Sequence, residues 1–198
     1  MTVREIAGTP RVVLLAGSLS AHSSADRLAR WCARRCVAAG LPSAVFSGTD
    51  LEFPFYRPGR TEPRSRAFLD ALAGADGVVL LSPAYHGAPS GLLKNALDYV
   101  NELADDPRPY LHGRAIGCVG VAGGDQGAHS TVASLRTIGH ALRGWPTPLG
   151  VTLARERAAF TDDGSPAHPS AVADLTVMVE QVLTMVRWAA REQADAVL

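Results

Sequence analysis

Four serines and a histidine lie close together where the first apolar run of the chain ends, in "AGSLSAHSSADRLARW". This stretch leaves a predicted strand at Gly17 and enters a predicted helix near Ser24. The unpaired N–H groups and positive dipole end at a helix start favour an anion. The stretch has neither a dinucleotide-binding G-x-G-x-x-G nor the lysine of a P-loop, so its hydroxyls suit a terminal monophosphate. One serine alone can also serve as a plain helix cap. The candidate phosphate ligands are Ser18, Ser20, His22, Ser23 and Ser24.

A second candidate loop, "GVAGGDQGAHS", follows a later apolar run and contains Gly123, Gly124 and Gly127. Glycines let a backbone approach a flat ligand closely, and exposed N–H groups there can bond to ring carbonyls. Taken alone this loop is only a turn. Combined with the phosphate loop, it predicts a slot for a phosphorylated aromatic cofactor, for which FMN is the natural candidate.

The third candidate loop lies between these two in the sequence, in "LLSPAYHGAPSGLLKNALDYV". It places Pro83, Tyr85, His86 and Gly87 at the end of an apolar strand, which is more conformational specialisation than a simple turn requires. We expect Tyr85 to touch the flavin rather than fill the core. We expect His86 to contact the ring or hydrogen-bond within the loop, because hydride transfer to a flavin needs no acid from the protein.

The elements that must position these loops alternate between strands and helices, which is typical of a parallel sheet covered on both faces. The sequence predicts one domain over 1–198 with an α/β fold, a flavodoxin-like three-layer sandwich whose five-stranded parallel sheet has the order 2-1-3-4-5. The three loops then meet beyond the carboxyl ends of the strands, where such sheets bind ligands. The predicted strands are 11–17, 42–48, 77–83, 114–124 and 146–154, and the predicted helices are 23–40, 65–75, 89–105, 125–144 and 168–192.

Composition narrows the range of partners. Lys plus Arg and Asp plus Glu number 19 each, so there is no basic field for a nucleic acid. No run of eighteen apolar residues and no signal peptide is evident, which leads us to expect no membrane and a cytoplasmic location. We interpret the three cysteines as small buried side chains. The histidines lack metal-ligand spacing, so no metal is expected.

The residues of the third loop carry a resemblance to a known family. "SPAYHGAPSGLLKNALDYV" is similar to the S-P-x-Y-[NH]-G-x-x-x-x-x-L-K-N-x-x-D motif of the NADPH-dependent FMN reductases, which are flavodoxin-like. The phosphate loop and the glycine loop with its following helix are similar too, so the resemblance covers most of the chain. Ser20 departs from the family, whose members commonly have arginine there. The matching positions are Ser82, Pro83, Tyr85, His86, Gly87, Leu93, Lys94, Asn95 and Asp98.

This resemblance implies an NAD(P)H-dependent FMN reductase in which Pro83, Ala84, Tyr85, His86 and Gly87 line the flavin ring. FMN and NADPH (or NADH) are the implied cofactors, and flavin N5 rather than a catalytic side chain takes the hydride. Reduced flavin for a partner monooxygenase is the first implied use. Quinone, azo or chromate reduction is an alternative, as is an electron carrier without nicotinamide turnover. A homodimer or homotetramer is expected, because the helix over 92–103 has a broad apolar stripe.

Overall fold

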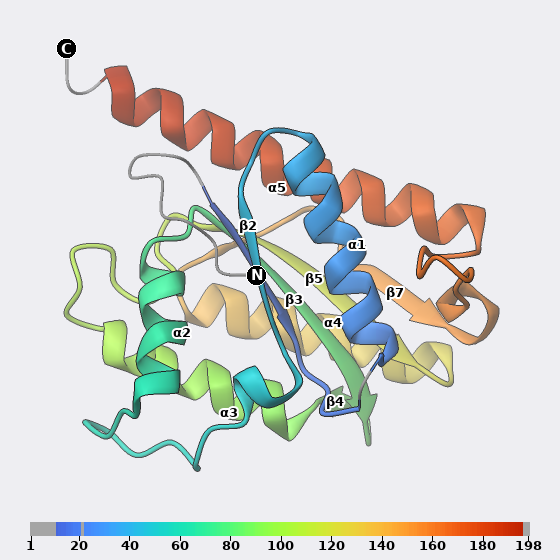
Figure 1. Cartoon of the computed structure of the whole chain (residues 1–198), viewed down its shortest axis with the longest axis horizontal. Coiled ribbons are helices and arrows are strands. Elements are labelled where there is room, and N and C mark those ends of the chain that lie inside the picture. The colour runs from blue at the N-terminus through green and yellow to red at the C-terminus, as the bar shows by residue number, and fades with distance from the viewer. Residues whose placement is uncertain (1–10, 21, 196–198) are drawn as a thin grey trace.

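A parallel sheet forms the centre of the molecule, in a computed structural model that describes residues 11–20 and 22–195 (Figure 1). Its strands are β1 (Val12–Ala16), β2 (Ser43–Ser47), β3 (Gly77–Tyr85) and β5 (Ala115–Ala122), with β6 (Trp145–Pro146) and β7 (Val151–Ala154) both pairing with β5. The order is β2-β1-β3-β5 followed by β6 and β7, which confirms the predicted order 2-1-3-4-5. The last strand is split in two where Pro146 and Pro148 occur, because proline donates no ladder hydrogen bond.

Helices cover both faces of this sheet and complete the three predicted layers (Figure 1). Apolar residues of α1 (Ser24–Ala38) and α5 (Pro169–Asp195) share one core cluster with the sheet. Those of α2 (Pro63–Ala73), α3 (Gly91–Asp98) and α4 (Asp125–Ala141) share the other. Three short 3-10 helices, Gly48–Leu51, Tyr99–Leu103 and Arg155–Ala158, continue or connect these elements.

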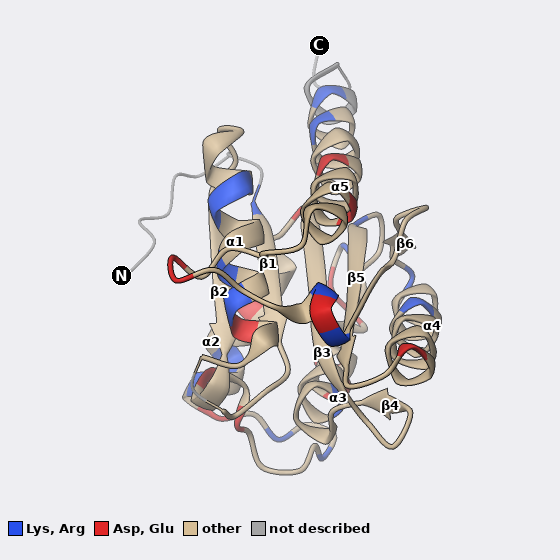
Figure 2. Ribbon diagram, turned by 90° about the vertical axis from the view of Figure 1, so that its right-hand side faces the viewer, with Lys and Arg blue, Asp and Glu red and all other residues tan. Residues whose placement is uncertain are grey.

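The central strands supply both core clusters because their side chains alternate between the two faces. In β1, Val12 and Leu14 belong to the cluster under α1 and α5, whereas Val13 and Leu15 belong to the other. All five residues of β1 are buried, as the continuous apolar run predicted. Figure 2 shows the charged residues gathered on helices and loops rather than on these strands.

The segment Pro169–Arg191 of α5 is long and apolar enough to cross a membrane, judged by length and composition alone. Its inner side nevertheless packs on the sheet, with residues such as Leu175, Met178 and Val182 fully buried in the core. This packing accounts for the apolar character of the helix.

The apolar stripe of α3 and the 3-10 helix after it is used up inside the chain. Leu93, Ala96, Leu97, Val100 and Leu103 are all buried in one core cluster, and the partly buried Leu92 packs against it. The stripe therefore offers no free face to a second subunit, contrary to the reason given for expecting a homodimer or homotetramer, and the assembly itself stays a prediction. The sheet, α2 and the aromatic residues Phe53 and Tyr56 of the loop before α2 cover it together, which helical periodicity alone does not reveal.

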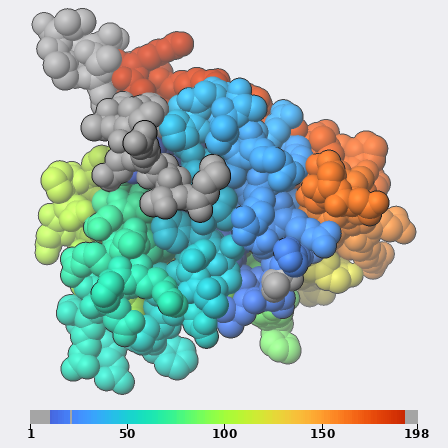
Figure 3. Space-filling view, viewed as in Figure 1, coloured from blue at the N-terminus to red at the C-terminus, as the bar shows by residue number. Residues whose placement is uncertain are grey.

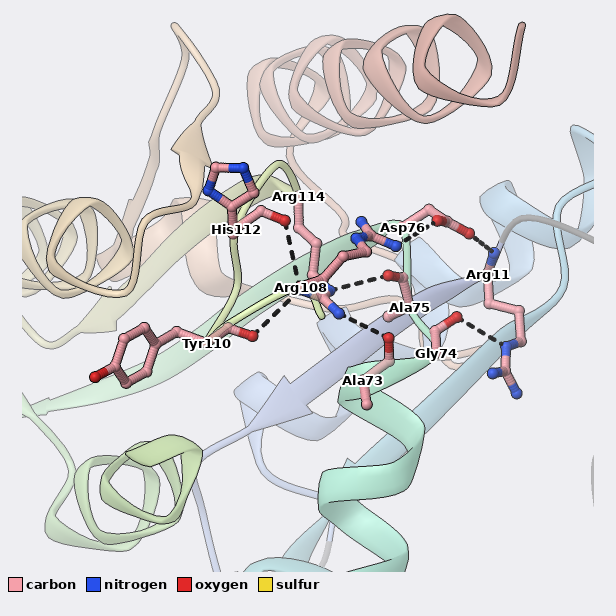
Figure 4. A network of polar contacts seen from close by, with 9 residues as sticks. All are labelled: Arg11, Ala73, Gly74, Ala75, Asp76, Arg108, Tyr110, His112 and Arg114. Atoms are coloured by element: carbon pink, nitrogen blue, oxygen red, sulfur yellow. Dashed lines mark hydrogen bonds and ion pairs between the residues drawn. The ribbon is translucent and has the colours of Figure 1, made fainter. Parts of the chain in front are cut away.

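The amino-terminal edge of the sheet is tied together by a buried guanidinium (Figure 4). Arg114, just before β5, is fully buried and donates to the carbonyl oxygens of Ala73 (2.7 Å), Ala75 (3.0 Å) and Tyr110 (3.2 Å). Burial lowers the pKa of Arg114 to about 10, so the group remains protonated at neutral pH. Beside it, Asp76 pairs with Arg108 at 3.1 Å. The candidate loops lie at the opposite, carboxyl edge.

Candidate functional site

Two of the four serines in the phosphate loop hydrogen-bond to the backbone, and the hydroxyl groups of the other two are free within the part of the chain that the structure describes. Ser23 is the N-cap of α1, and its Oγ accepts a hydrogen bond from the N–H of Asp26 at 3.2 Å. Ser18 is buried, and its Oγ accepts from the N–H of Ser20 at 3.3 Å. Ser20 is exposed and Ser24 half-buried, and neither hydroxyl has a partner among the described residues. The helix start therefore keeps two hydroxyls and its free N–H groups for an anion.

A small cavity of about 170 Å³ opens beside this loop, toward the end of β2. Ser18, Ser20 and His22 line it together with Asp26 and Arg30, two residues that sequence reasoning missed. Arg30 Nε donates to Asp26 Oδ2 at 3.1 Å, whereas Asp26 Oδ1 is buried without a partner among the described residues. The available sequence signals were the S-x-x-D spacing from Ser23 to Asp26 and the i,i+4 spacing from Asp26 to Arg30.

The stretch between the predicted strand 77–83 and the predicted helix 89–105 is a β-hairpin, which the sequence did not predict. β3 continues to Tyr85, which pairs antiparallel with Ala88 of β4 (Ala88–Pro89). His86 and Gly87 form the turn with φ of 53° and 81°, as a two-residue hairpin with the favoured twist requires. Tyr85 is 55% exposed and lies outside the core, while its contact with a flavin stays a prediction.

Two buried serines fix the base of this hairpin to the start of α3. Ser90 donates its backbone N–H to Ser82 Oγ at 2.9 Å, and its own Oγ caps the helix by accepting from Leu93 N at 3.2 Å. Gly17 lies against the same place, because a Cβ there would come within 2.6 Å of Leu93 Cβ and Ser90 Oγ. The absence of a side chain at Gly17 thus lets the phosphate loop pack directly on α3.

α4 begins at Asp125, as the predicted helix 125–144 did, so the loop after β5 consists of Gly123 and Gly124, and Gly127 lies within the helix. A Cβ at Gly123 or Gly124 would meet nothing within 4 Å, so the backbone there borders open space. Gly127 differs: it lies in the first turn of α4, where a Cβ would be 3.3 Å from Ala122 Cβ and 3.5 Å from Ala84 Cβ. Gly127 therefore packs the helix against β3 and β5, while its contact with a flavin stays a prediction.

The three loops converge at the carboxyl edge of the sheet, as predicted. Gly17 N donates to Leu81 O at 2.9 Å, which joins the phosphate loop to β3. A Cβ at Gly87 would lie 3.6 Å from Ser130 Oγ, which places the hairpin turn on α4. Hydroxyls at a helix start and an open glycine wall beside an exposed tyrosine fit a flavin mononucleotide.

The cysteines are buried, as the sequence predicted. Burial raises the pKa of Cys36 to about 11 and that of Cys118 to about 12, and it raises the pKa of Cys32 further. All three thiols are protonated at neutral pH and are poor nucleophiles. The cysteines therefore act as small core side chains.

A flavodoxin-like parallel sheet whose candidate ligand loops meet at its carboxyl edge is typical of the flavin-binding class of α/β proteins. Residues 10–158 match the family described as NADPH-dependent FMN reductase, so the chain belongs to that family and is an oxidoreductase. The match spans all three candidate loops.

Individual relatives agree with this assignment. The NADPH-dependent FMN reductase ArsH of Acidithiobacillus ferrooxidans is 30% identical over 94% of this chain and 77% of its own length. An FMN-dependent NADPH-azoreductase of Staphylococcus aureus is 26% identical over 77% of this chain and 81% of its own. The fold is shared with FerB, a flavoenzyme NAD(P)H:(acceptor) oxidoreductase from Paracoccus denitrificans, at a TM-score of 0.75, 17% identity and coverage of 90% and 98%.

Proposed function

We propose that the protein binds FMN at the three loops and catalyses hydride transfer from NADPH or NADH to flavin N5. The observation that carries this proposal is the open backbone at Gly123 and Gly124 beside an exposed hairpin. A hydride donor must lie parallel to the flavin at about 3–3.5 Å, so one ring face has to be accessible. Bound FMN supplies the redox chemistry itself.

The chain's own residues have positioning roles in this proposal. The N–H groups at the start of α1 and the hydroxyls of Ser20 and Ser24 hold the phosphate. Backbone groups from Pro83 to Gly87 and those of Gly123 and Gly124 contact the ring. Tyr85 is the described aromatic side chain that the hairpin offers to a flat ligand.

We also propose which acceptor takes the electrons from the reduced flavin. Exchange of reduced FMN with a partner monooxygenase suits an exposed phosphate loop in which Ser20 offers a hydroxyl and no charge. Quinone, azo or chromate reduction at the same open face is the alternative, and the azoreductase relative supports it.

Assembly and location belong to the proposal as well. A homodimer or homotetramer is supported by large apolar side chains that stay exposed and have no role in the proposed ligand sites, namely Trp145 at 58% and Trp188 at 59%. We place the protein in the cytoplasm, consistent with three cysteines that form no disulfide.

Anaerobic mixing tests the function directly. The FMN-loaded protein should lose its oxidised-flavin absorbance band (about 450 nm) rapidly and completely when NADPH or NADH is added. An absorbance unchanged over minutes with both nucleotides would support the electron-carrier alternative and overturn the reductase proposal. Protein without FMN serves as the blank.

A further inference from the structure

A large cavity lies apart from the flavin loops, between the segment 54–62 and the start of α2. Its volume is about 940 Å³, within the range of small-molecule sites, and its lining includes Tyr99, which follows α3. Figure 3 shows this segment, in teal, projecting from the lower edge of the molecule, as the green hairpin tip also does. The reductase proposal gives the cavity no role so far.

Positive charge dominates the cavity lining. Arg57, Arg60 and Arg66 contribute three guanidinium groups against the one carboxylate of Glu62. None of these four forms a salt bridge within the described residues, and Arg66 donates to the neutral hydroxyl of Thr61 at 2.6 Å. Arginine forks match the oxygens of a phosphate group, so this wall suits a phosphomonoester.

The cavity also offers an aromatic surface held in place from α3. The ring of Phe55 is 90% exposed, whereas the backbone on both sides of it is fixed. Asn95 bonds to Pro54 O (3.0 Å) and Tyr56 N (2.9 Å). Tyr99 Oη donates to Pro54 O at 3.0 Å. A flat base can stack on a ring that is presented in this way.

The cavity is within reach of the flavin loops. Leu93 of α3 contacts the phosphate loop at Gly17, and Tyr99 lines the cavity. Tyr99 lies six positions after Leu93, a separation of about 9 Å at the helical rise of 1.5 Å per residue. Two riboses and a diphosphate, which separate the nicotinamide of NADPH from its adenine, can bridge this distance.

We propose that this cavity binds the adenosine end of NADPH, with Arg57 and Arg60 contacting the 2'-phosphate and Phe55 stacking on the adenine. The proposal rests on the reductase function and names the residues that select NADPH over NADH. Arg64 is excluded, because its guanidinium donates to the carbonyl of Thr49 at 3.0 Å and does not line the cavity.

Calorimetric titration with 2',5'-ADP and 5'-ADP tests the site without any redox reaction. The FMN-loaded protein should bind 2',5'-ADP at least tenfold more tightly than 5'-ADP. The double variant R57Q/R60Q should lose this preference, whereas the matched control R64Q should keep it. Arg57 and Arg60 are exposed, so the double variant should fold normally.

Equal affinity for the two nucleotides in the wild type, or a preference that survives in R57Q/R60Q, would overturn the assignment. Kinetics give a second readout, since the NADPH-over-NADH ratio of kcat/KM should fall at least tenfold in R57Q/R60Q and remain unchanged in R64Q. A failure of the reductase proposal looks different, because neither nucleotide would then bleach the flavin in the wild type.

Discussion

At the scale of single residues, Ser23 caps α1 and lies where the FMN phosphate is proposed to bind. Aspartate is as good an N-cap as serine, so Ser23→Asp should preserve the hydrogen bond now accepted from Asp26 N at 3.2 Å. The added negative charge should repel the phosphate. We expect FMN affinity to fall more than tenfold, since each charge-assisted bond to a phosphate contributes about 1.5–3 kcal/mol. Fluorescence titration measures this affinity.

The matched control for that substitution is Ser23→Asn, which caps equally well without adding a charge. It should bind FMN within about threefold of the wild type, a factor well below one charge-assisted bond. Riboflavin lacks the phosphate, so its affinity should be weaker than that of FMN in the wild type and the same in all three proteins. If Ser23→Asp weakened riboflavin as much as FMN, the phosphate site would have to lie elsewhere.

Which residues could be foreseen from the sequence depends on how local their roles are. The cap at Ser23 and the turn glycine at Gly87 follow from short-range rules and were predicted as a helix start and a turn. Asp26 was not predicted, because a partly unpaired buried carboxylate is visible only once the surrounding elements are packed. The grouping of Arg57 with Arg66 also depends on the fold, since a loop and a helix bring them together.

At the scale of elements, two glycines test whether a loop is packed or open. Gly17→Ala would force a Cβ to within 2.6 Å of Leu93 and Ser90, so the phosphate loop and α3 would have to separate. We expect a loss of about 1–3 kcal/mol in the free energy of unfolding, typical of overpacking. Gly123→Ala meets nothing within 4 Å and should leave stability unchanged. Urea denaturation of the FMN-free protein measures both.

FMN affinity should also distinguish these two variants, because here Gly123→Ala is the variant expected to lose function. In Gly123→Ala the methyl group enters the space assigned to the flavin ring, and FMN affinity should fall about tenfold, the effect of about 1.4 kcal/mol. A Gly123→Ala variant with wild-type FMN affinity would show that this wall does not contact the flavin. Gly17→Ala with wild-type stability would contradict the tight packing against α3.

The elements show where sequence patterns stop being informative. Hydrophobic runs predicted the central strands and all five long helices, because burial on both faces leaves a continuous apolar signature. The hairpin was missed because β4 has only two residues, Ala88 and Pro89, and makes no pattern. The split of the last strand was missed for a similar reason, since β6 is equally short.

At the scale of the whole molecule, the two edges of the sheet have separate tasks. The carboxyl edge carries the three loops, the open backbone at Gly123 and the arginine-lined cavity. The amino-terminal edge contains the buried Arg114 network and Asp76 with its two arginine partners (Figure 4). Stability and ligand binding should therefore respond to different substitutions.

Arg114→Met tests this separation. Methionine removes the donor that now serves the carbonyls of Ala73, Ala75 and Tyr110. Each buried carbonyl left without a hydrogen-bond donor destabilises the fold by about 1–3 kcal/mol. Together these losses exceed the stabilisation gained by removing the buried charge of the guanidinium. We expect the free energy of unfolding to fall by about 2–4 kcal/mol. The loss stays below the sum for three carbonyls because water can reach some of them once the surrounding structure adjusts.

The conservative variant Arg114→Lys keeps a charge but cannot span three carbonyls with one ammonium group, so it should lose about half as much stability. Because Arg114 lies at the edge opposite the loops, both variants should keep FMN affinity within about twofold of the wild type under conditions where they remain folded, as expected for distant sites. Urea denaturation and flavin titration on the same samples give the two quantities. A large loss of FMN affinity in folded Arg114→Lys would show that the two edges are energetically coupled through β3 and β5, and that the fold does not keep its stabilising network apart from its binding site.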